Sequence, residues 1–148
     1  MSAPMTEYLE SLGAPAVLLE RVDTFLATYS VLLPEEVVSC FVSEYRDEAD
    51  QRTFESLWLF SDHFAMEAQL LGSSEDQLDF VPHQQSVRHI VVRKRAFDLV
   101  EPTAASRMTV EVWYGEQRYG VLRATGDNCV HLTKILQEHL IANAIPSA

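Results

Sequence analysis

The chain has 148 residues, of which 47% are hydrophobic, and its formal net charge at pH 7 is -11. That length and hydrophobic content suit one folded domain with its own core, and they argue against an intrinsically disordered chain. The negative charge argues against binding to nucleic acid or to an anionic membrane, because both of these partners are polyanions.

The cellular location is predicted from the N-terminal residues and the cysteines. No Lys or Arg precedes Arg21, and no apolar run approaches the roughly 18 residues that a membrane span needs. Cys40 and Cys129 are too few for a disulfide framework, and both stand among apolar residues. We therefore expect a cytoplasmic protein whose two thiols are buried and unreactive.

Two helices are expected in residues 1–31, ahead of a domain at residues 32–148. Thr6 is placed to cap a short helix that ends near Leu12, and Pro15 suits the first turn of a second helix. Apolar residues recur at helical spacing along the second helix and form one stripe. This stripe consists of Leu18, Val22, Phe25, Leu26 and Tyr29.

The apolar stripe has two alternative roles. It can pack on the core of its own chain, or it can form an interface with a partner or with a second copy of the chain. We favour packing on the chain's own core, because residues 32–34 leave only a short connection to the first strand, and short connections favour adjacent packing.

The middle of the chain alternates in hydrophobicity with a period of two, which indicates strands. We expect a first strand near residues 38–42, a polar turn over 44–52, and a central strand over 54–60 that is apolar on both faces. Residues 64–71 alternate like a strand, although their composition favours a helix. We choose the strand, because the apolar residues at even positions then share one face.

More strands follow in the second half, at residues 78–82, 87–99 and 108–114. Residues 115–116, Gly and Glu, predict a two-residue hairpin turn after the last of these. In that register Val112 would face Tyr119 on the inner surface. Trp113 would face Arg118 on the outer surface, where a cation–π contact could form. The alternative is that a helix, such as the one expected at 16–30, covers Trp113. The other pairing expected on the inner surface is Val110 with Val121.

Residues 127–143 predict one amphipathic helix, capped by Asp127 or Asn128, that closes the chain. The order of elements predicts an α+β fold: a bent antiparallel β-barrel or sandwich with an N-terminal amphipathic helix and a C-terminal capping helix. The apolar face of the closing helix consists of Cys129, Leu132, Ile135, Leu136 and Leu140.

Residues 32–144 resemble bacterial pleckstrin-homology-like domains. The resemblance rests on LPEE at residues 33–36, LWLFSD at 57–62 and FVP at 80–82, followed by the terminal strand pair and a single helix. It implies a strongly bent sheet of seven strands that the C-terminal helix caps, in a family whose roles are binding and scaffolding. The loop between the first two strands departs from lipid-binding members, because its four acids outnumber its two arginines.

A second resemblance is to class I type III secretion chaperones, which are small, acidic, mixed α/β and usually dimeric. The amphipathic helix at 16–30 and the pI near 4.7 would suit them. The number of strand-like segments favours the pleckstrin-homology-like alternative. Residues 62–71 separate the two, since a strand there supports the barrel or sandwich and a helix packed on the sheet supports the chaperone.

The densest group of basic side chains lies in residues 88–95 and suits an acidic partner or a phosphate. The alternative is an edge strand whose charges prevent edge-to-edge pairing and neutralise nearby acids. Alternate side chains of a strand point to opposite faces, so these residues need not form one flat patch. The candidate interaction surface consists of Arg88, Arg93, Lys94, Arg95, Trp113 and Arg118.

No catalytic group, metal motif or phosphate-binding glycine loop can be read from the sequence. Ser61, Asp62 and His63 stand side by side, but adjacent residues of a strand point to opposite faces and would not form a relay. We therefore expect no enzyme, no cofactor and no metal. The leading hypothesis is a non-catalytic cytoplasmic module that binds or scaffolds a protein, either another protein or a second copy of itself. A small-ligand or enzyme scaffold, which a large apolar pocket with convergent polar groups would indicate, is a third alternative.

Overall fold

The computed structural model describes residues 1–13, 16–33, 35–49, 51–68, 78–82, 87–96, 101–116 and 119–143. Two helices come first, α1 (Ala3–Ser11) and α2 (Ala16–Tyr29), and a 3-10 turn (Ser30–Leu32) follows them. The closing helix begins as α3 (Asn128–Ile135) and continues through a π turn (Leu136–Leu140) and a 3-10 turn (Ile141–Asn143). The strands between them are β1 (Ser39–Arg46), β2 (Arg52–Phe60), β3 (Phe64–Ala68), β4 (Leu78–Pro82), β5 (His89–Arg95), β6 (Arg107–Trp113) and β7 (Tyr119–Thr125).

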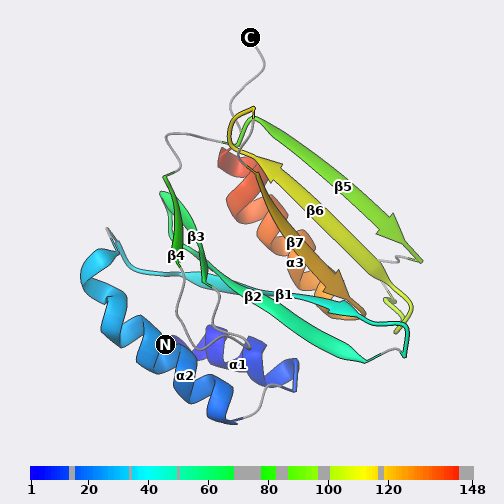
Figure 1. Cartoon of the computed structure of the whole chain (residues 1–148), viewed down its shortest axis with the longest axis horizontal. Helices are drawn as coiled ribbons and strands as arrows, with labels where there is room; N and C mark the ends of the chain where they lie inside the picture. The colour runs from blue at the N-terminus through cyan, green and yellow to red at the C-terminus, as the bar shows by residue number, and fades with distance from the viewer. Residues whose placement is uncertain are drawn as a thin grey trace.

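The strands form two antiparallel sheets rather than a closed barrel. One sheet has the order β1-β2-β3-β4, and the other has the order β5-β6-β7. The two sheets approach one another where β1 meets β7, and α3 packs beside that junction (Figure 1). The predicted α+β sandwich with a C-terminal capping helix is therefore confirmed.

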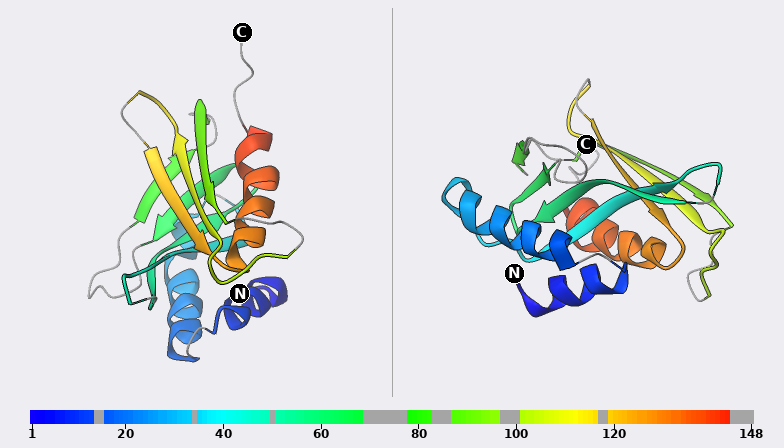
Figure 2. Two further views of the ribbon diagram at one scale, coloured as in Figure 1. Left: turned by 90° about the vertical axis from the view of Figure 1, so that its right-hand side faces the viewer. Right: turned by 60° about the horizontal axis from the view of Figure 1, so that its bottom comes forward.

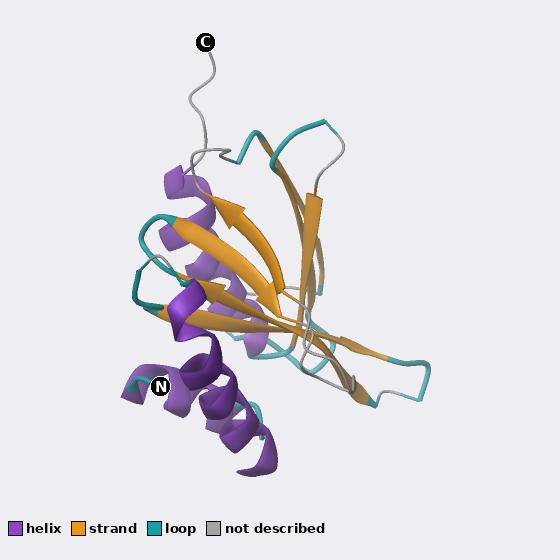
Figure 3. Ribbon diagram, turned by 60° about the vertical axis from the view of Figure 1, so that its left-hand side comes forward, coloured by secondary structure: helices purple, strands orange, loops and turns teal. Residues whose placement is uncertain are grey.

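Strands β1, β2 and β3 of the first sheet contribute side chains to two cores, one on each face, since successive residues of a strand point to opposite sides. Phe41, Trp58 and Phe60 face the second sheet and α3 in one core. Leu57 and Leu59 point the other way, into a core shared with α1 and α2. Figures 2 and 3 show these two helices on one side of the first sheet and α3 on the other. The prediction that residues 54–60 form a central strand with two apolar faces is confirmed.

The apolar stripe of α2 packs within its own chain. Val22 and Phe25 are 1% and 3% exposed and belong to the core of the first sheet. Leu26 and Tyr29 are half-buried against the same core. The side chain of Leu18 lies outside the described part of the structure. These contacts agree with the preference for packing on the chain's own core, and the oligomeric state stays a prediction.

Helix α1 begins earlier than the sequence predicts. Ser2, rather than Thr6, occupies the capping position, and its Oγ accepts a hydrogen bond from the backbone nitrogen of Met5 at 3.4 Å. Thr6 lies inside the helix, where its hydroxyl donates to the carbonyl of Ser2. Pro4 explains the difference, because its fixed φ and missing N–H suit the first turn of a helix.

The first hairpin is longer than predicted, since residues 44–46 belong to β1 and Arg52 begins β2. The carboxylate of Glu44 is fully buried, and Arg52 Nε lies 2.7 Å from one of its oxygens. The turn itself is closed by Asp47, which accepts two backbone hydrogen bonds from residues 49 and 51. The sequence misleads here because a buried ion pair has the same composition as an exposed polar loop.

Side chains of β1 join the two sheets at the β1–β7 junction. Ser43 Oγ accepts a hydrogen bond from the backbone nitrogen of Arg123 at 2.9 Å. Glu44 accepts from the backbone nitrogen and the hydroxyl of Thr125 at 3.1 and 2.9 Å. Both donors lie on the edge of β7 that no strand of the second sheet covers. We call these hydrogen bonds the seam.

Residues 64–68 form strand β3, so the choice of strand over helix is confirmed there. The side chains of Phe64, Met66 and Ala68 share the face toward α1 and α2, as the alternation predicts. Residues 69–71 lie outside the described part of the chain. A strand at this position favours the pleckstrin-homology-like alternative over the secretion chaperone.

The later strands also match their predictions in part. β4 corresponds to the extended piece at 78–82, and β6 corresponds to the strand at 108–114. β5 covers the middle of the predicted strand at 87–99, of which residues 97–99 lie outside the described residues.

The register of the last hairpin differs from the predicted one. Trp113 lies opposite Tyr119, and Val112 lies opposite Gly120. Residues 114–118 therefore separate the paired ends, in place of a two-residue turn. Arg118, the predicted neighbour of Trp113, lies outside the described residues.

The shift by one position exchanges the two faces of β7. Leu122 points into the core and Tyr119 is 54% exposed, whereas the prediction placed Tyr119 and Val121 inside. The physical reason lies at Gly120, which packs directly against the indole ring of Trp58 and leaves no space for a side chain. Only the register found in the structure places glycine over that ring.

The closing helix forms as predicted, and all of its predicted apolar face is buried. Asp127 occupies the N-cap position, which is one of the two predicted alternatives, but its side chain makes no capping hydrogen bond. The amide of Asn128 instead donates to the carbonyl of Val42 at 3.1 Å and accepts from the hydroxyl of Tyr8 at 2.8 Å. These tertiary partners replace the local cap.

Candidate functional site

Most of the candidate interaction surface lies on the outward side of the second sheet. Residues at odd positions of β5 and β6 point away from the core, because their even-numbered neighbours in β6 are buried. We call this side the outer face. β5 is the edge strand of its sheet, which agrees with the charged edge strand considered from the sequence.

One end of the outer face is aromatic. The rings of Trp113 and Tyr119 stack with centroids 4.5 Å apart and planes 26° apart. His89 lies directly opposite Trp113 on the neighbouring strand. A hollow of about 470 Å³ opens beside these rings, and we call it the aromatic hollow. Its lining consists of Arg88, His89, Val91, Glu111, Trp113, Gly115 and Glu116.

The other end of the outer face is cationic. A hollow of about 350 Å³ lies there, and we call it the basic hollow. Its lining consists of Arg93, Lys94, Arg95, Arg107 and Thr109. An ion pair of 2.8 Å between Arg93 and Glu111 lies between the two hollows, because Glu111 lines one and Arg93 lines the other.

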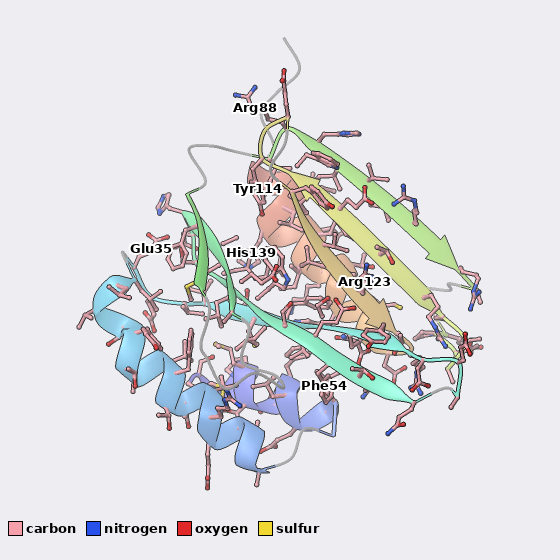
Figure 4. The ribbon with its side chains drawn as sticks, viewed as in Figure 1. Glu35, Phe54, Arg88, Tyr114, Arg123 and His139 are labelled. Atoms are coloured by element: carbon pink, nitrogen blue, oxygen red, sulfur yellow. The ribbon has the colours of Figure 1, made fainter. Side chains whose placement is uncertain are left out.

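The β7 side of the outer face is bounded by a second ion pair. Arg123 projects from β7 (Figure 4). Its guanidinium contacts both oxygens of Glu55 in β2 at 2.8 and 2.9 Å. This pair links the two sheets across their exposed side. The cations that line the basic hollow therefore come from β5 and β6 rather than from β7.

The structure brings together most of the surface residues predicted from the sequence. Arg88 precedes β5 and lines the aromatic hollow, while Arg93, Lys94 and Arg95 line the basic hollow. The predicted contact between Trp113 and Arg118 is not tested, because Arg118 lies outside the described residues. The sequence did not single out Arg107 and Tyr119, because their places opposite Arg95 and Trp113 depend on strand pairing.

A separate cavity of about 460 Å³ lies between α1, β1 and the closing helix. Its wall includes Tyr8, whose ring stacks on His131 with centroids 3.7 Å apart. His131 Nε2 donates to the carbonyl of Cys40 at 2.8 Å, and burial lowers the pKa of this imidazole. Burial also raises the pKa of the Tyr8 hydroxyl well above its ordinary value. These polar groups are occupied by bonds within the fold, so they act as structural contacts.

A third polar cluster joins the segment before β1 to the turn between β2 and β3. One carboxylate oxygen of Glu35 accepts hydrogen bonds from the hydroxyl of Ser61 and the backbone nitrogen of His63, and its other oxygen lies 2.7 Å from His63 Nδ1. The hydrogen bond from Ser61 lowers the pKa of Glu35, and the contact with Glu35 raises the pKa of His63. Asp62 is exposed, and its charge adds a smaller contribution to the raised pKa of His63.

The cysteines are buried as the sequence predicts. Burial raises the pKa of Cys40 to about 12 and that of Cys129 to about 11. In the described residues, no three His, Cys, Asp or Glu side chains converge in a way that could hold a metal ion. No described helix combines the length and the apolar character required to cross a bilayer.

The fold of this chain has a counterpart among solved structures. No protein-family model and no curated protein matches the sequence. The crystal structure of a pleckstrin homology domain from Shewanella amazonensis SB2B is similar, with a TM-score of 0.51 and 14% sequence identity. The match covers 78% of this chain and 95% of that chain. A likeness at this identity concerns the fold alone. The chain therefore has a pleckstrin-homology-like fold, in agreement with the resemblance seen in residues 32–144.

Proposed function

We propose that this chain is a non-catalytic cytoplasmic module that binds a protein partner on its outer face. The pleckstrin-homology-like fold supports a binding role in general terms and does not specify the partner. The observation that carries the proposal is the pairing of an aromatic hollow and a basic hollow on one exposed sheet. The Arg93–Glu111 ion pair separates the two hollows.

The chemistry of the two hollows defines the kind of partner. Trp, Tyr and Arg are the side chains most enriched where protein interfaces gain their binding energy. The aromatic hollow suits an apolar or aromatic side chain, and the basic hollow suits an acidic group. The edge position of β5 suits an extended segment, because such a segment can form backbone hydrogen bonds with a sheet edge.

The charge distribution limits the acidic part of that partner. Residues 1–87 hold 16 acidic and 3 basic side chains, whereas residues 88–148 hold 6 and 8. A partner that is acidic over a wide area would be repelled by the first set. A short segment that places its acidic group in the basic hollow avoids this repulsion. We therefore infer an extended segment with one apolar anchor and a local negative charge.

Peptides selected from a displayed random library on the immobilised full chain test this proposal. We expect the selected sequences to combine an aromatic or large aliphatic residue with Asp or Glu. Their affinity should fall at least about tenfold on the Trp113→Thr variant, because truncating a central interface aromatic costs roughly 2 kcal/mol or more.

The matched control is Tyr45→Thr, which removes an exposed aromatic ring from the first sheet. Tyr45 is 42% exposed in β1 and lines neither hollow. Peptide affinity should be unchanged in this variant, and circular dichroism should show that both variants are folded. Selected peptides that bind Trp113→Thr as tightly as the unaltered chain would place the binding surface elsewhere.

A further inference from the structure

Two arginines lie directly opposite one another in the basic hollow. Arg95 at the end of β5 pairs in register with Arg107 at the start of β6, and both lie at outward positions. Like charges at directly opposite positions destabilise an antiparallel pair of strands. Within the described part of the chain, the side chain of Arg95 makes no hydrogen bond or ion pair. An anion bound between the two guanidinium groups would attract both of them and so offset their mutual repulsion.

Described residues next to this pair fix the backbone at the ends of β5 and β6. Ala96, the residue after Arg95, has φ +50, a left-handed conformation that residues with a side chain rarely adopt. Ser106 is fully buried, and its hydroxyl donates to the carbonyl of Ala96 at 2.7 Å. Arg107 Nη1 donates to the carbonyls of Ala104 and Ser106 at 2.6 and 2.9 Å. Backbone strain of this kind is found at sites that hold ligands.

The donors of the hollow suit a phosphoryl group better than a carboxylate. Arginines from two strands, a lysine and the hydroxyl of Thr109 line the same space. A phosphoryl group at pH 7 carries roughly two negative charges and three acceptor oxygens, whereas a carboxylate carries one charge and two oxygens. Guanidinium groups that reach in from two strands can each hold separate oxygens of a tetrahedral group.

The distance between the two hollows sets the spacing of the ligand. Trp113 and Arg107 stand six residues apart on β6, which corresponds to about 20 Å of extended chain. Figure 1 shows β5 and β6 running antiparallel along this length, so the hollows lie at opposite ends of one sheet. An extended segment of the same length reaches from one hollow to the other.

We propose that the basic hollow binds a phosphorylated residue of the partner segment, about six positions from the side chain that enters the aromatic hollow. This inference rests on the proposed function, because it assigns the acidic group of the same partner. A phosphorylated peptide is favoured over an anionic membrane, since the net charge of -11 repels an extended anionic surface but permits one local phosphoryl group.

The test measures peptide affinity for the full chain at constant ionic strength. One peptide carries Trp and phosphoserine six residues apart, and its matched partners carry Ser or Glu in place of phosphoserine. Each is made in both chain directions. The phosphoserine peptide should bind about tenfold more tightly than the Ser peptide, because a charge-assisted hydrogen bond contributes enough for one factor of ten. The Glu peptide should bind with intermediate affinity.

Substitutions on β5 identify the site. Arg95→Gln should remove the preference for phosphoserine. Arg95→Lys keeps the positive charge and should retain part of that preference. The control is Lys134→Gln, which removes one positive charge from an exposed position of the closing helix that lines neither hollow, and it should keep the preference. Arg95 is exposed, so these variants should fold, and circular dichroism checks this.

Further probes separate the sources of the phosphoryl group. Inorganic phosphate that shifts the backbone resonances of residues 95 and 107, with no phosphoserine preference in peptides, would contradict a peptide ligand. Phosphatidylserine vesicles that bind through Arg95 would contradict it as well. Equal affinity for the three peptides would overturn the inference, while a loss of affinity in Trp113→Thr would leave the proposed function intact.

Discussion

The hydroxyl of Tyr8 accepts a hydrogen bond from the backbone nitrogen of Val42, at a distance of 2.9 Å. The same hydroxyl donates to Asn128 at 2.8 Å. β1 is the edge strand of its sheet, so this amide would otherwise be left without a partner. One side chain of α1 thus connects β1 to the closing helix.

Tyr8→Phe should destabilise the chain by about 1–3 kcal/mol, because it leaves the Val42 amide and the Asn128 oxygen without that partner. Urea unfolding measures the change. Tyr45→Phe is the control, since Tyr45 is 42% exposed and should change the free energy of unfolding by less than about 0.5 kcal/mol. Equal effects of the two substitutions would mean that the Tyr8 hydroxyl is not structurally important.

Gly120→Ala should be strongly destabilising, because the new Cβ would clash with the ring of Trp58. Overpacking of this kind costs about 1–3 kcal/mol. Gly115→Ala is the matched control, since nothing lies within 4 Å of its Cβ position. Thermal unfolding of the two variants tests the register of the last hairpin, and a stable Gly120→Ala chain would contradict it.

Ala96→Gly should stabilise the chain by up to about 1 kcal/mol, because glycine adopts a positive φ without the steric cost that alanine has. Ala105→Gly should be neutral or destabilising, since Ala105 has no positive φ. Chemical unfolding compares the two. A loss of stability in Ala96→Gly would argue against the left-handed conformation beside the basic hollow.

His63 and His131 should titrate on opposite sides of the ordinary histidine pKa of 6.5. The contact with Glu35 raises the pKa of His63, and burial lowers the pKa of His131. The His63 contact therefore favours the folded state below pH 6.5 and is lost as the pH rises through the raised pKa. Buried, neutral His131 favours the folded state above pH 6.5. This stabilisation is lost as the pH falls from 6.5 through the lowered pKa of His131.

NMR titration of the imidazole resonances measures both pKa values. Glu35→Gln provides the control, because it should return the pKa of His63 toward 6.5 and leave that of His131 unchanged. A His63 pKa that stays the same in this variant would show that the Glu35 contact does not form in solution.

A chain that ends at Gly126 should unfold or aggregate. It lacks Leu132, Leu136 and Leu140, and burial of each such side chain contributes about 2 kcal/mol. That loss is comparable with the whole stability of a typical domain, roughly 5–15 kcal/mol. A chain that ends at Asn143 keeps every described residue of the helix and should unfold cooperatively. Cooperative thermal unfolding of the shorter chain would contradict the capping role.

The elements that follow from local pattern could be predicted from the sequence. Strand β2 has apolar residues on both faces and lies in the centre of the first sheet. The closing helix buries its whole apolar stripe. Trp113 could also be placed on the outer face, because alternation along β6 is strict. These features depend only on the residues within one element.

Features that depend on distant residues could not be predicted in this way. The register of β7 is determined by Trp58, which stands far away in the sequence and lies over Gly120. The basic hollow requires Arg107 to meet Arg95, and only strand pairing reveals that meeting. The local sequence around Glu44 predicts a polar loop, because its hydrogen-bond partner on β7, Thr125, is distant in the sequence.

The seam has a consequence for how this fold can diverge. The two sheets are joined there by side chains of Ser43 and Glu44, each of which reaches a backbone amide about eighty positions away. The strand ladders themselves do not require those side chains. Substitutions at these two positions during evolution would therefore strengthen or weaken the contact between the two sheets. The strand pairing within each sheet would stay the same.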